Sequence, residues 1–208
     1  MRLIGKRRVA AATLLFLFVC IASCGGAPAR RRAVSPAAPG SAALIEDIQQ
    51  RTFRWFWETT NPDNGLVPDR WPTESFSSIA AVGFGLTAYG IGAERGWVSR
   101  DDAARRVLTT LRFFLDSKQG TEASGATGYR GFYYHFVDMK TGVRFKEVEL
   151  STIDTTLLLA GALFCQSYFD RDNAAEAAIR DTVEQLYRRM EWTYCQERPP
   201  LVSMGWTP

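Results

Sequence analysis

Two apolar, glycine-containing segments, each followed by an amphipathic one, constrain the fold of this chain more than any other feature. Residues 77–94 and 152–169 have the length of helices and are apolar on nearly all sides, which is typical of helices buried all round. Residues 100–116 and 174–192 alternate charged and apolar side chains at helical spacing. This order predicts helical hairpins in which an outer helix covers an inner one.

Residues 42–59 predict a further helix, because apolar and aromatic side chains recur there at helical spacing, with Ser41 as a candidate N-cap. Ser99 and Asp102 have the spacing of a capping box at the start of the helix over 100–116. Each internal glycine of residues 77–94 costs about 1 kcal/mol of helix propensity relative to alanine. Such a cost is tolerable where neighbours approach closely, so this helix is expected to be central.

Residues 132–161 hold most of the candidate chemistry. An aromatic run with the only histidine, His135, turns through residues 138–142 and returns, which predicts a β-hairpin. Glu149 and Asp154 then follow around the start of the second apolar helix. The hairpin is therefore expected to deliver carboxylates to the mouth of a buried helix. The glycine-rich segment before the aromatic run is expected to be a flexible loop.

Two interpretations of Asp154 are open from spacing. It lies three residues after Ser151, and S-x-x-D is a capping signal, so Asp154 is as much a candidate cap as a catalytic group. Glu149 lies in a charged stretch where a solvated glutamate is the default. A carboxylate at a helix N-terminus is favoured in its charged form, which suits a base or a charge stabiliser. His135, within aromatic neighbours, has the setting of a half-buried structural histidine.

Charge and motif patterns argue against several function classes. Seven of the 25 basic residues lie in residues 1–32, which contain no acid, so 18 basic residues face 22 acidic ones afterwards. No nucleic-acid-binding face is expected from that balance. No metal-ligand spacing, Gly-rich phosphate loop or G-x-S-x-G elbow occurs, so no metal and no cofactor are expected. Carboxylates, Arg70, one histidine and many aromatic residues remain, a mixture that suits sugars.

The N-terminus has the features of a targeting segment. Residues 1–23 combine a positive start with an apolar core too short to span a bilayer, which predicts a signal peptide. Residues 21–23 before Cys24 resemble a bacterial lipobox, with a plain secretory signal as the alternative. Residues 24–41 predict a disordered tether before a domain over residues 42–208. We expect an extracytoplasmic protein with a lipid anchor on Cys24, in the outer membrane because no aspartate follows that cysteine.

Two further cysteines lie in the body of the chain, Cys165 and Cys195. Buried thiols are the commoner state for such residues, and a disulfide is permitted outside the cytoplasm. Sequence leaves both states open.

Five segments of the body are similar to the bacterial glucoamylase-like domain, a family that includes endo-β-1,2-glucanases and a module of cyclic β-1,2-glucan synthases. The segments are residues 52–70, 77–96, 131–139, 149–161 and 201–208. The resemblance implies an all-α fold, an (α/α)6 toroid of helical hairpins with a small β-hairpin insertion. Five helices cannot close such a ring, so we expect an incomplete ring and the front part of a longer protein.

The resemblance also implies extracytoplasmic glucan chemistry, with Asp154 and Glu149 as the best catalytic candidates. Its candidate sugar contacts are Asp69, Arg70, Trp71, Tyr134, His135 and Trp206. Hydrolysis of a glycosidic bond needs two carboxyl groups, and another cleft acid is expected outside this chain. We therefore expect part of an inverting glycoside hydrolase acting on an oligo- or polysaccharide β-glucan, endo-β-1,2-glucanase-like and inactive as a fragment. The alternatives are a non-catalytic glucan-binding lipoprotein and a structural helical lipoprotein in which Asp154 is only a cap.

Overall fold

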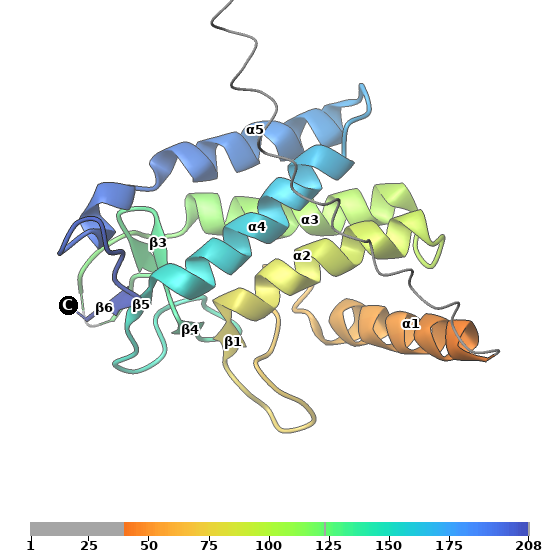
Figure 1. Cartoon of the computed structure of the whole chain (residues 1–208), viewed down its shortest axis with the longest axis horizontal. Coiled ribbons are helices and arrows are strands. Elements are labelled where there is room, and N and C mark those ends of the chain that lie inside the picture. The colour runs from red at the N-terminus through yellow and green to blue at the C-terminus, as the bar shows by residue number, and fades with distance from the viewer. Residues whose placement is uncertain (1–39, 123, 208) are drawn as a thin grey trace, which may run out of the picture. The chain divides into compact units, whose positions relative to one another are not determined.

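The computed structural model describes residues 40–207 except Ala123, and the described chain is mainly helical (Figure 1). Its α-helices are α1 (Ser41–Thr59), α2 (Ile79–Glu94), α3 (Arg100–Asp116), α4 (Thr152–Tyr168) and α5 (Ala174–Arg189). A short 3-10 helix, Trp192–Cys195, follows α5. The five helices expected from sequence are confirmed. The signal peptide, Cys24 and nearly all of the tether lie outside the described residues and stay predictions.

The two apolar helices, α2 and α4, run side by side through the centre of the fold (Figure 1). Their backbones meet at two glycines. A Cβ added to Gly161 would lie 2.1 Å from the carbonyl oxygen of Gly83, and one added to Gly83 would lie 2.2 Å from the carbonyl oxygen of Leu157. Each glycine therefore admits the backbone of the facing helix, which confirms the expected central position of α2 and explains why glycine is tolerated inside it.

Gly161→Ala is expected to lower the free energy of unfolding by about 1–3 kcal/mol or more, because the new methyl group meets backbone that cannot rotate away. Denaturant unfolding of the full chain measures the effect. Ala160→Ser is the matched control, since it also adds one heavy atom to α4 but at an exposed position, where changes stay within about 0.5 kcal/mol. Equal midpoints for the two variants would contradict the close approach of α2 and α4.

The amphipathic helices cover this pair, with α3 packed against α2 and α5, and α5 packed against α4. Their starts are capped by side chains. Ser99 accepts a hydrogen bond from the backbone N–H of Asp102, as the capping-box spacing predicts, and Asn173 accepts one from Glu176. The prediction for α1 is wrong in detail, because Gly40 in a left-handed conformation is its N-cap and Ser41 lies within the helix.

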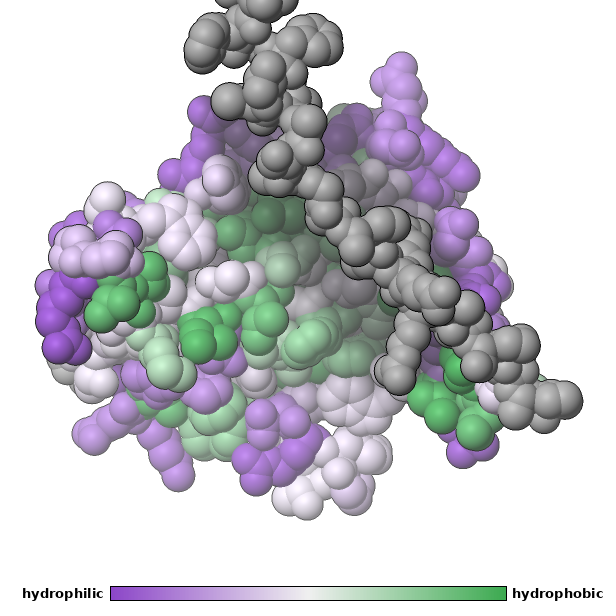
Figure 2. Space-filling view, in the orientation of Figure 1, coloured by the Kyte–Doolittle hydropathy of each residue, from purple (hydrophilic) through white to green (hydrophobic). Residues whose placement is uncertain are grey.

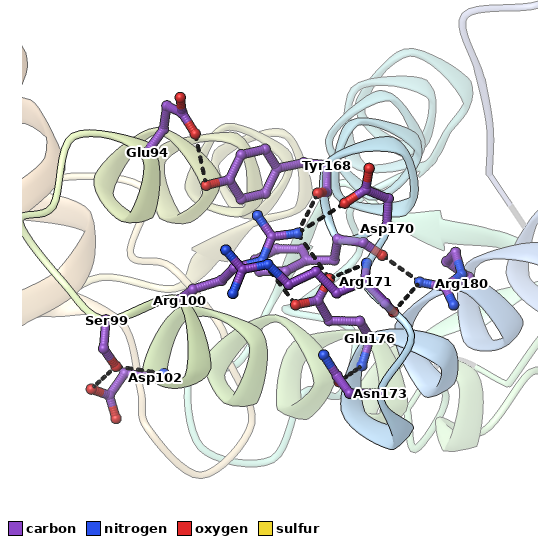
Figure 3. A network of polar contacts seen from close by, with 11 residues as sticks. Glu94, Ser99, Arg100, Asp102, Tyr168, Asp170, Arg171, Asn173, Glu176 and Arg180 are labelled. Atoms are coloured by element: carbon purple, nitrogen blue, oxygen red, sulfur yellow. Dashed lines mark hydrogen bonds and ion pairs between the residues drawn. The ribbon is translucent and has the colours of Figure 1, made fainter.

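A buried ion pair, here called the Arg100–Glu176 clamp, joins three helices at the end of the fold opposite the strands (Figure 3). Arg100 at the start of α3 donates from Nε and Nη2 to the two carboxylate oxygens of Glu176 in α5, both at 2.8 Å. Nη2 also donates to the carbonyl of Tyr168 in α4 at 2.7 Å, and the guanidinium lies 4.5 Å above the ring of that tyrosine. Glu176 is only 1% exposed. Hydrogen bonding to Arg100 is the largest cause that lowers the pKa of Glu176 to about 2.

Two small antiparallel sheets lie at the end where α2 and α4 begin (Figure 1). One pairs β1 (Ser77–Ser78) with β4 (Phe136–Val137). The other has the order β2 (Gly128–Tyr129), β3 (Phe132–Tyr134), β5 (Leu150–Ser151) and β6 (Gly205–Trp206). Because β1 runs directly into α2 and β5 directly into α4, the sheets fix the N-termini of both inner helices.

The predicted hairpin around residues 138–142 is present but short. Val137 and Arg144 form an antiparallel bridge, and the backbone N–H of Phe145 donates to the carbonyl of Phe136 across it. The aromatic strand β3 pairs instead with β2 and β5, and β4 pairs with β1. All three side chains of β3 are buried, so the strand sits inside the fold and both of its edges are covered.

The glycine segment before β3 is a loop over most of its described length, and it ends in the two-residue strand β2. The turn between β2 and β3 has positive φ at both central residues, Arg130 (52°) and Gly131 (85°), as in the type I′ turns that close two-residue hairpins. Arginine is not a usual residue in this conformation. Its guanidinium lies over the rings of Tyr129 and Tyr194 and pairs with Glu191, and these contacts hold the turn.

Several large apolar side chains are exposed on the described part of the chain. On the inner helices they are Phe84, Ile91, Ile153, Leu157 and Leu163, and in the first half of α1 they are Leu44, Ile45 and Ile48. Figure 2 shows apolar side chains gathered in the middle of the viewed face, over the inner helices. The apolar residues of α1 predict that the whole helix packs against the core. Only the second half of α1 does so, and Phe53 is its buried residue. Such exposure fits a partial toroid. None of the described helices combines the length and hydropathy needed to cross a membrane.

Candidate functional site

The residues with candidate chemistry gather where α2 and α4 begin. His135 follows β3, Glu149 precedes β5, and Asp154 lies in the first turn of α4. The backbone N–H of His135 donates to the carbonyl of Glu149 at 3.0 Å, and the carbonyl of His135 accepts from the N–H of Ile79 at 3.2 Å. The backbone of His135 therefore ties the first residue of α2 to the strand that leads into α4.

The side chains of these three residues form an acid–histidine cluster, defined here as Glu149, His135 and Asp154. His135 Nδ1 lies 2.8 Å from Glu149 Oε1, and His135 Nε2 lies 3.6 Å from Asp154 Oδ1. The imidazole stacks on the ring of Phe136 with centroids 3.8 Å apart. The Glu149 side chain is 42% exposed and the Asp154 side chain 14% exposed. Glu149 is therefore the more accessible carboxylate, and Asp154 lies behind it.

Asp154 also takes part in the cap of α4. Ser151 Oγ accepts from the backbone N–H of Asp154 at 3.1 Å and donates to its Oδ2 at 2.5 Å. The S-x-x-D capping signal is thus confirmed with Ser151 as the N-cap, and Asp154 supports that serine through one carboxylate oxygen only. The other oxygen, Oδ1, faces His135. One side chain can therefore serve the helix and the cluster together.

Arg70 and Trp71 line a cavity of about 660 Å³ between the loop over residues 68–76 and the turn over 138–145. Arg70 is held by Asp69, with Nη2 3.0 Å from Oδ2, and its guanidinium lies 5.4 Å from the centroid of the Phe76 ring. Trp71 is 65% exposed. An exposed indole beside a held guanidinium, in a concavity of ligand-binding size, can contact a sugar ring and its hydroxyl groups.

A row of aromatic contacts links this cavity to the acid–histidine cluster. The ring centroid of Phe76 lies 4.6 Å from that of Phe145 and 4.3 Å from that of Phe136, which stacks on His135. Asp138 also lines the cavity, and hydrogen bonds led by the backbone N–H of Thr141 lower its pKa. The cavity therefore keeps a negative charge beside the cations Arg70 and Lys140.

The other predicted sugar contacts differ in accessibility. Trp206 in β6 lies opposite Leu150, next to Glu149 in the chain, and its half-buried ring stacks on Tyr129 at 5.7 Å. Tyr134 is fully buried, and its hydroxyl donates to the carbonyl of Gly120. The prediction that Tyr134 contacts a sugar directly is therefore wrong, because its ring is buried in the core.

Cys165 and Cys195 are buried free thiols, which settles the alternative left by the sequence in favour of the reduced state. Burial raises the pKa of both thiols, so neither is a reactive nucleophile. Within residues 40–207, no three His, Cys, Asp or Glu side chains are grouped as a metal site would need.

Sequence reasoning missed Phe76, Phe145 and Lys140, which line the cavity. No motif marks them, since they come from a loop and a turn that only the β1–β4 pairing brings together. The aromatic run over residues 132–136 was the one available signal, and it indicated a strand without indicating which strand pairs with it.

Comparisons with known proteins give relatives of one kind, although no protein-family profile matches the chain. A curated exo β-1,2-glucooligosaccharide sophorohydrolase from Parabacteroides distasonis is 29% identical over 173 residues, which are 79% of this chain and 23% of that protein. The chain thus spans less than a quarter of this relative's length.

Solved structures show the same similarity. A putative glucoamylase from Bacteroides uniformis has a TM-score of 0.69 and 29% identity, over 79% of this chain and 40% of its own. A β-1,2-glucanase from Parabacteroides distasonis has a TM-score of 0.69 and 27% identity, over 83% of this chain and 24% of its own. The endo-β-1,2-glucanase of Chitinophaga pinensis, solved with sophorotriose and glucose, shares the fold at 21% identity and a TM-score of 0.69. The described chain is therefore similar in sequence and fold to part of proteins named as putative glucoamylases and β-1,2-glucanases, as its motifs predict.

Proposed function

We propose that this chain is part of a glycoside hydrolase that cleaves a β-linked glucan, with β-1,2 linkages as the first candidate. The observation that carries the proposal is the position of the acid–histidine cluster. It lies at the start of both inner helices, and the rings of Phe136 and Phe76 connect it to a cavity with an exposed tryptophan and a held arginine. The relatives named as β-1,2-glucan hydrolases support the linkage.

Hydrolysis of a glycosidic bond needs one carboxyl group to protonate the leaving oxygen and a second to activate water or attack the sugar. In this proposal either Glu149 or Asp154 supplies one of these two carboxyl groups. Glu149 reaches solvent directly, and Asp154 keeps one oxygen free of the helix cap. The partner acid comes from the remainder of the toroid, and a separation of about 6.5–9.5 Å would make the enzyme inverting.

The cavity beside the cluster holds the glucan in this proposal. The indole of Trp71 packs against the C–H face of one glucose unit, and Arg70 donates to hydroxyl groups from the position that Asp69 gives it. The aromatic row through Phe76 and Phe136 leads from that sugar toward the acids, so the next units of the glucan run along it.

Product analysis of the complete enzyme tests the function. We expect chromatography to show shorter oligosaccharides from linear β-1,2-glucan, and little release from β-1,3- or β-1,4-glucans. Binding of β-1,2-glucan without any product would favour the non-catalytic glucan-binding alternative. Absence of both binding and product would contradict the proposal.

Trp71→Ala is expected to weaken glucan binding about tenfold, because a buried aromatic contact contributes about 0.5–1.5 kcal/mol beyond its area. Calorimetric titration with a β-1,2-glucooligosaccharide measures the loss. Tyr187→Ala is the matched control, since Tyr187 is also an exposed aromatic residue but lies on the outer helix α5. If the Trp71 variant and the wild type bound the oligosaccharide with equal affinity, the cavity would not be part of the glucan-binding site.

A further inference from the structure

The only histidine of the chain contacts both candidate acids, each through a different ring nitrogen. The two contacts are unequal. Nδ1 to Glu149 Oε1, at 2.8 Å, has hydrogen-bond length, whereas Nε2 to Asp154 Oδ1, at 3.6 Å, is too long for one. His135 is therefore bound firmly on its Nδ1 side and loosely on its Nε2 side.

This inequality decides which nitrogen carries the proton of the neutral ring. An ionised carboxylate only accepts hydrogen bonds, so Nδ1 must donate to Glu149. The hydrogen bond at one nitrogen of a histidine sets the state of the other. Nε2 is then left without a proton and faces Asp154 Oδ1 as an acceptor.

The imidazole is also fixed from other directions. Its backbone N–H and carbonyl are bonded to Glu149 and Ile79, in two different elements. Its ring stacks on Phe136 at an interplanar angle of 26°, and Phe136 is in turn in contact with Phe76. A half turn of the ring would place Cδ2 where Nδ1 lies, so it would break the bond to Glu149.

We propose that His135 is a positioning residue that fixes the Glu149 carboxylate through Nδ1–H and presents an unprotonated Nε2 to Asp154. The sequence resemblance implies a sugar contact for His135. In this proposal His135 instead gives the two acids different surroundings, because its ring donates a hydrogen bond to Glu149 and none to Asp154. Glu149 is held as a hydrogen-bond acceptor at the accessible edge, whereas Asp154 is held by Ser151 and has no hydrogen bond to the ring. The catalytic meaning of this arrangement rests on the proposed glucan hydrolysis, but the arrangement itself does not.

Nitrogen-15 NMR of the full chain tests the tautomer without any substrate. Because the chain contains one histidine, its imidazole gives a single pair of nitrogen signals. At alkaline pH, where imidazoles are neutral, we expect a protonated Nδ1 and an unprotonated Nε2, in a ratio of about tenfold or more, as suits a hydrogen bond to a charged group. Wild-type protein with the Nε2–H tautomer, which free histidine favours, would overturn the proposal.

Glu149→Ala and Asp154→Asn identify the partner that fixes the tautomer. Glu149→Ala should return the ring toward the Nε2–H form, and Asp154→Asn should leave Nδ1 protonated. The reverse pattern would assign the positioning to Asp154 and overturn the proposal. If either variant does not fold, the wild-type spectrum still decides, and a wild type with the expected spectrum but no glucan hydrolysis would refute only the proposed function.

His135→Asn and His135→Gln test the catalytic consequence in the complete enzyme. Asparagine can place an N–H near the position of Nδ1, and glutamine places one near Nε2. We expect His135→Gln to lower kcat about 100-fold with little change in KM, as misplacement of a reacting group does, and His135→Asn to recover about tenfold of that loss. A raised KM with unchanged kcat would make His135 a sugar contact, and equal loss in both variants would make it a purely structural residue; either result overturns the proposal.

Discussion

Asp154→Asn is expected to reduce glucan hydrolysis by the complete enzyme about 10²–10⁴-fold while the protein melts close to the wild-type temperature. The asparagine side chain keeps the shape of aspartate and still offers one oxygen to Ser151 Oγ, and the backbone N–H of residue 154 still donates to Ser151. The cap of α4 is therefore retained. What asparagine cannot do is ionise, so the chemistry opposite His135 is lost. Initial rates on β-1,2-glucan and thermal melting of the same samples measure both effects.

Ser151→Ala measures the stability that the cap of α4 contributes. It removes the side chain that caps α4, which should lower stability by about 0.5–2 kcal/mol. It also removes one hydrogen bond to Asp154 Oδ2, but it keeps the carboxylate, so the loss of turnover should be smaller than for Asp154→Asn. Glu149→Gln should resemble Asp154→Asn if both acids take part in the reaction. If Asp154→Asn keeps substantial activity while Asp154→Ala only lowers the melting temperature, Asp154 is a cap, and catalysis moves to Glu149 or to the remainder of the enzyme.

Arg100→Met is expected to destabilise the fold by about 3–5 kcal/mol, because it leaves the carboxylate of Glu176 buried without its partner. Glu176 is 1% exposed, and its carboxylate accepts two hydrogen bonds from its cationic partner, Arg100, and one from the backbone N–H of Arg171. Arg95→Met is the matched control. Arg95 pairs with Glu46 at 3.1 Å, but both side chains are nearly half exposed, and such pairs contribute below about 1 kcal/mol. Chemical denaturation of both variants measures the difference, and similar midpoints would contradict a stabilising clamp.

The clamp also gives stability a definite pH dependence. The pKa of Glu176 falls from 4.5 to about 2 on folding, chiefly because Arg100 donates to it, so between these values the unfolded chain binds more protons than the folded one. The contribution of about 3 kcal/mol is therefore present above pH 4.5 and is lost as the pH falls toward 2. Arg100→Met should remove this part of the slope. A variant with the same acid dependence as the wild type would contradict the assignment.

The helices could be predicted from sequence because each depends on local signals. Apolar periodicity defines α3 and α5, the S-x-x-D spacing marks the caps at Ser99 and Ser151, and the glycines of α2 indicate a close neighbour. These signals lie within a few residues of the feature that they specify, so no knowledge of the fold is needed.

The strands and the clamp could not be predicted for the opposite reason. Strands of two or three residues are too short for a period, and the turn at Arg130 depends on two tyrosines and Glu191 brought in from other elements. Arg100 and Glu176 are 76 residues apart, and on their own helices each looks like a solvent-facing charge. Their burial follows from the packing of α3 against α5.

The sequence predicted which acidic residues belong to the candidate site, but it did not predict how they are placed relative to one another. Glu149 and Asp154 are conspicuous beside an apolar helix, and the family resemblance made them candidates. Their meeting across His135 requires the pairing of Tyr134 with Leu150 in the β3–β5 register, which no local pattern specifies. The same register buries Tyr134, which sequence grouped with the sugar contacts.

The most direct test of the account is a crystal structure of the complete enzyme carrying Asp154→Asn, with a bound β-1,2-glucooligosaccharide. The account predicts that one sugar ring lies against Trp71 and that a glycosidic oxygen lies within hydrogen-bond reach, about 3 Å, of residue 154 or Glu149. A glucan bound away from the start of α2 and α4, with no contact to the acid–histidine cluster, would contradict it.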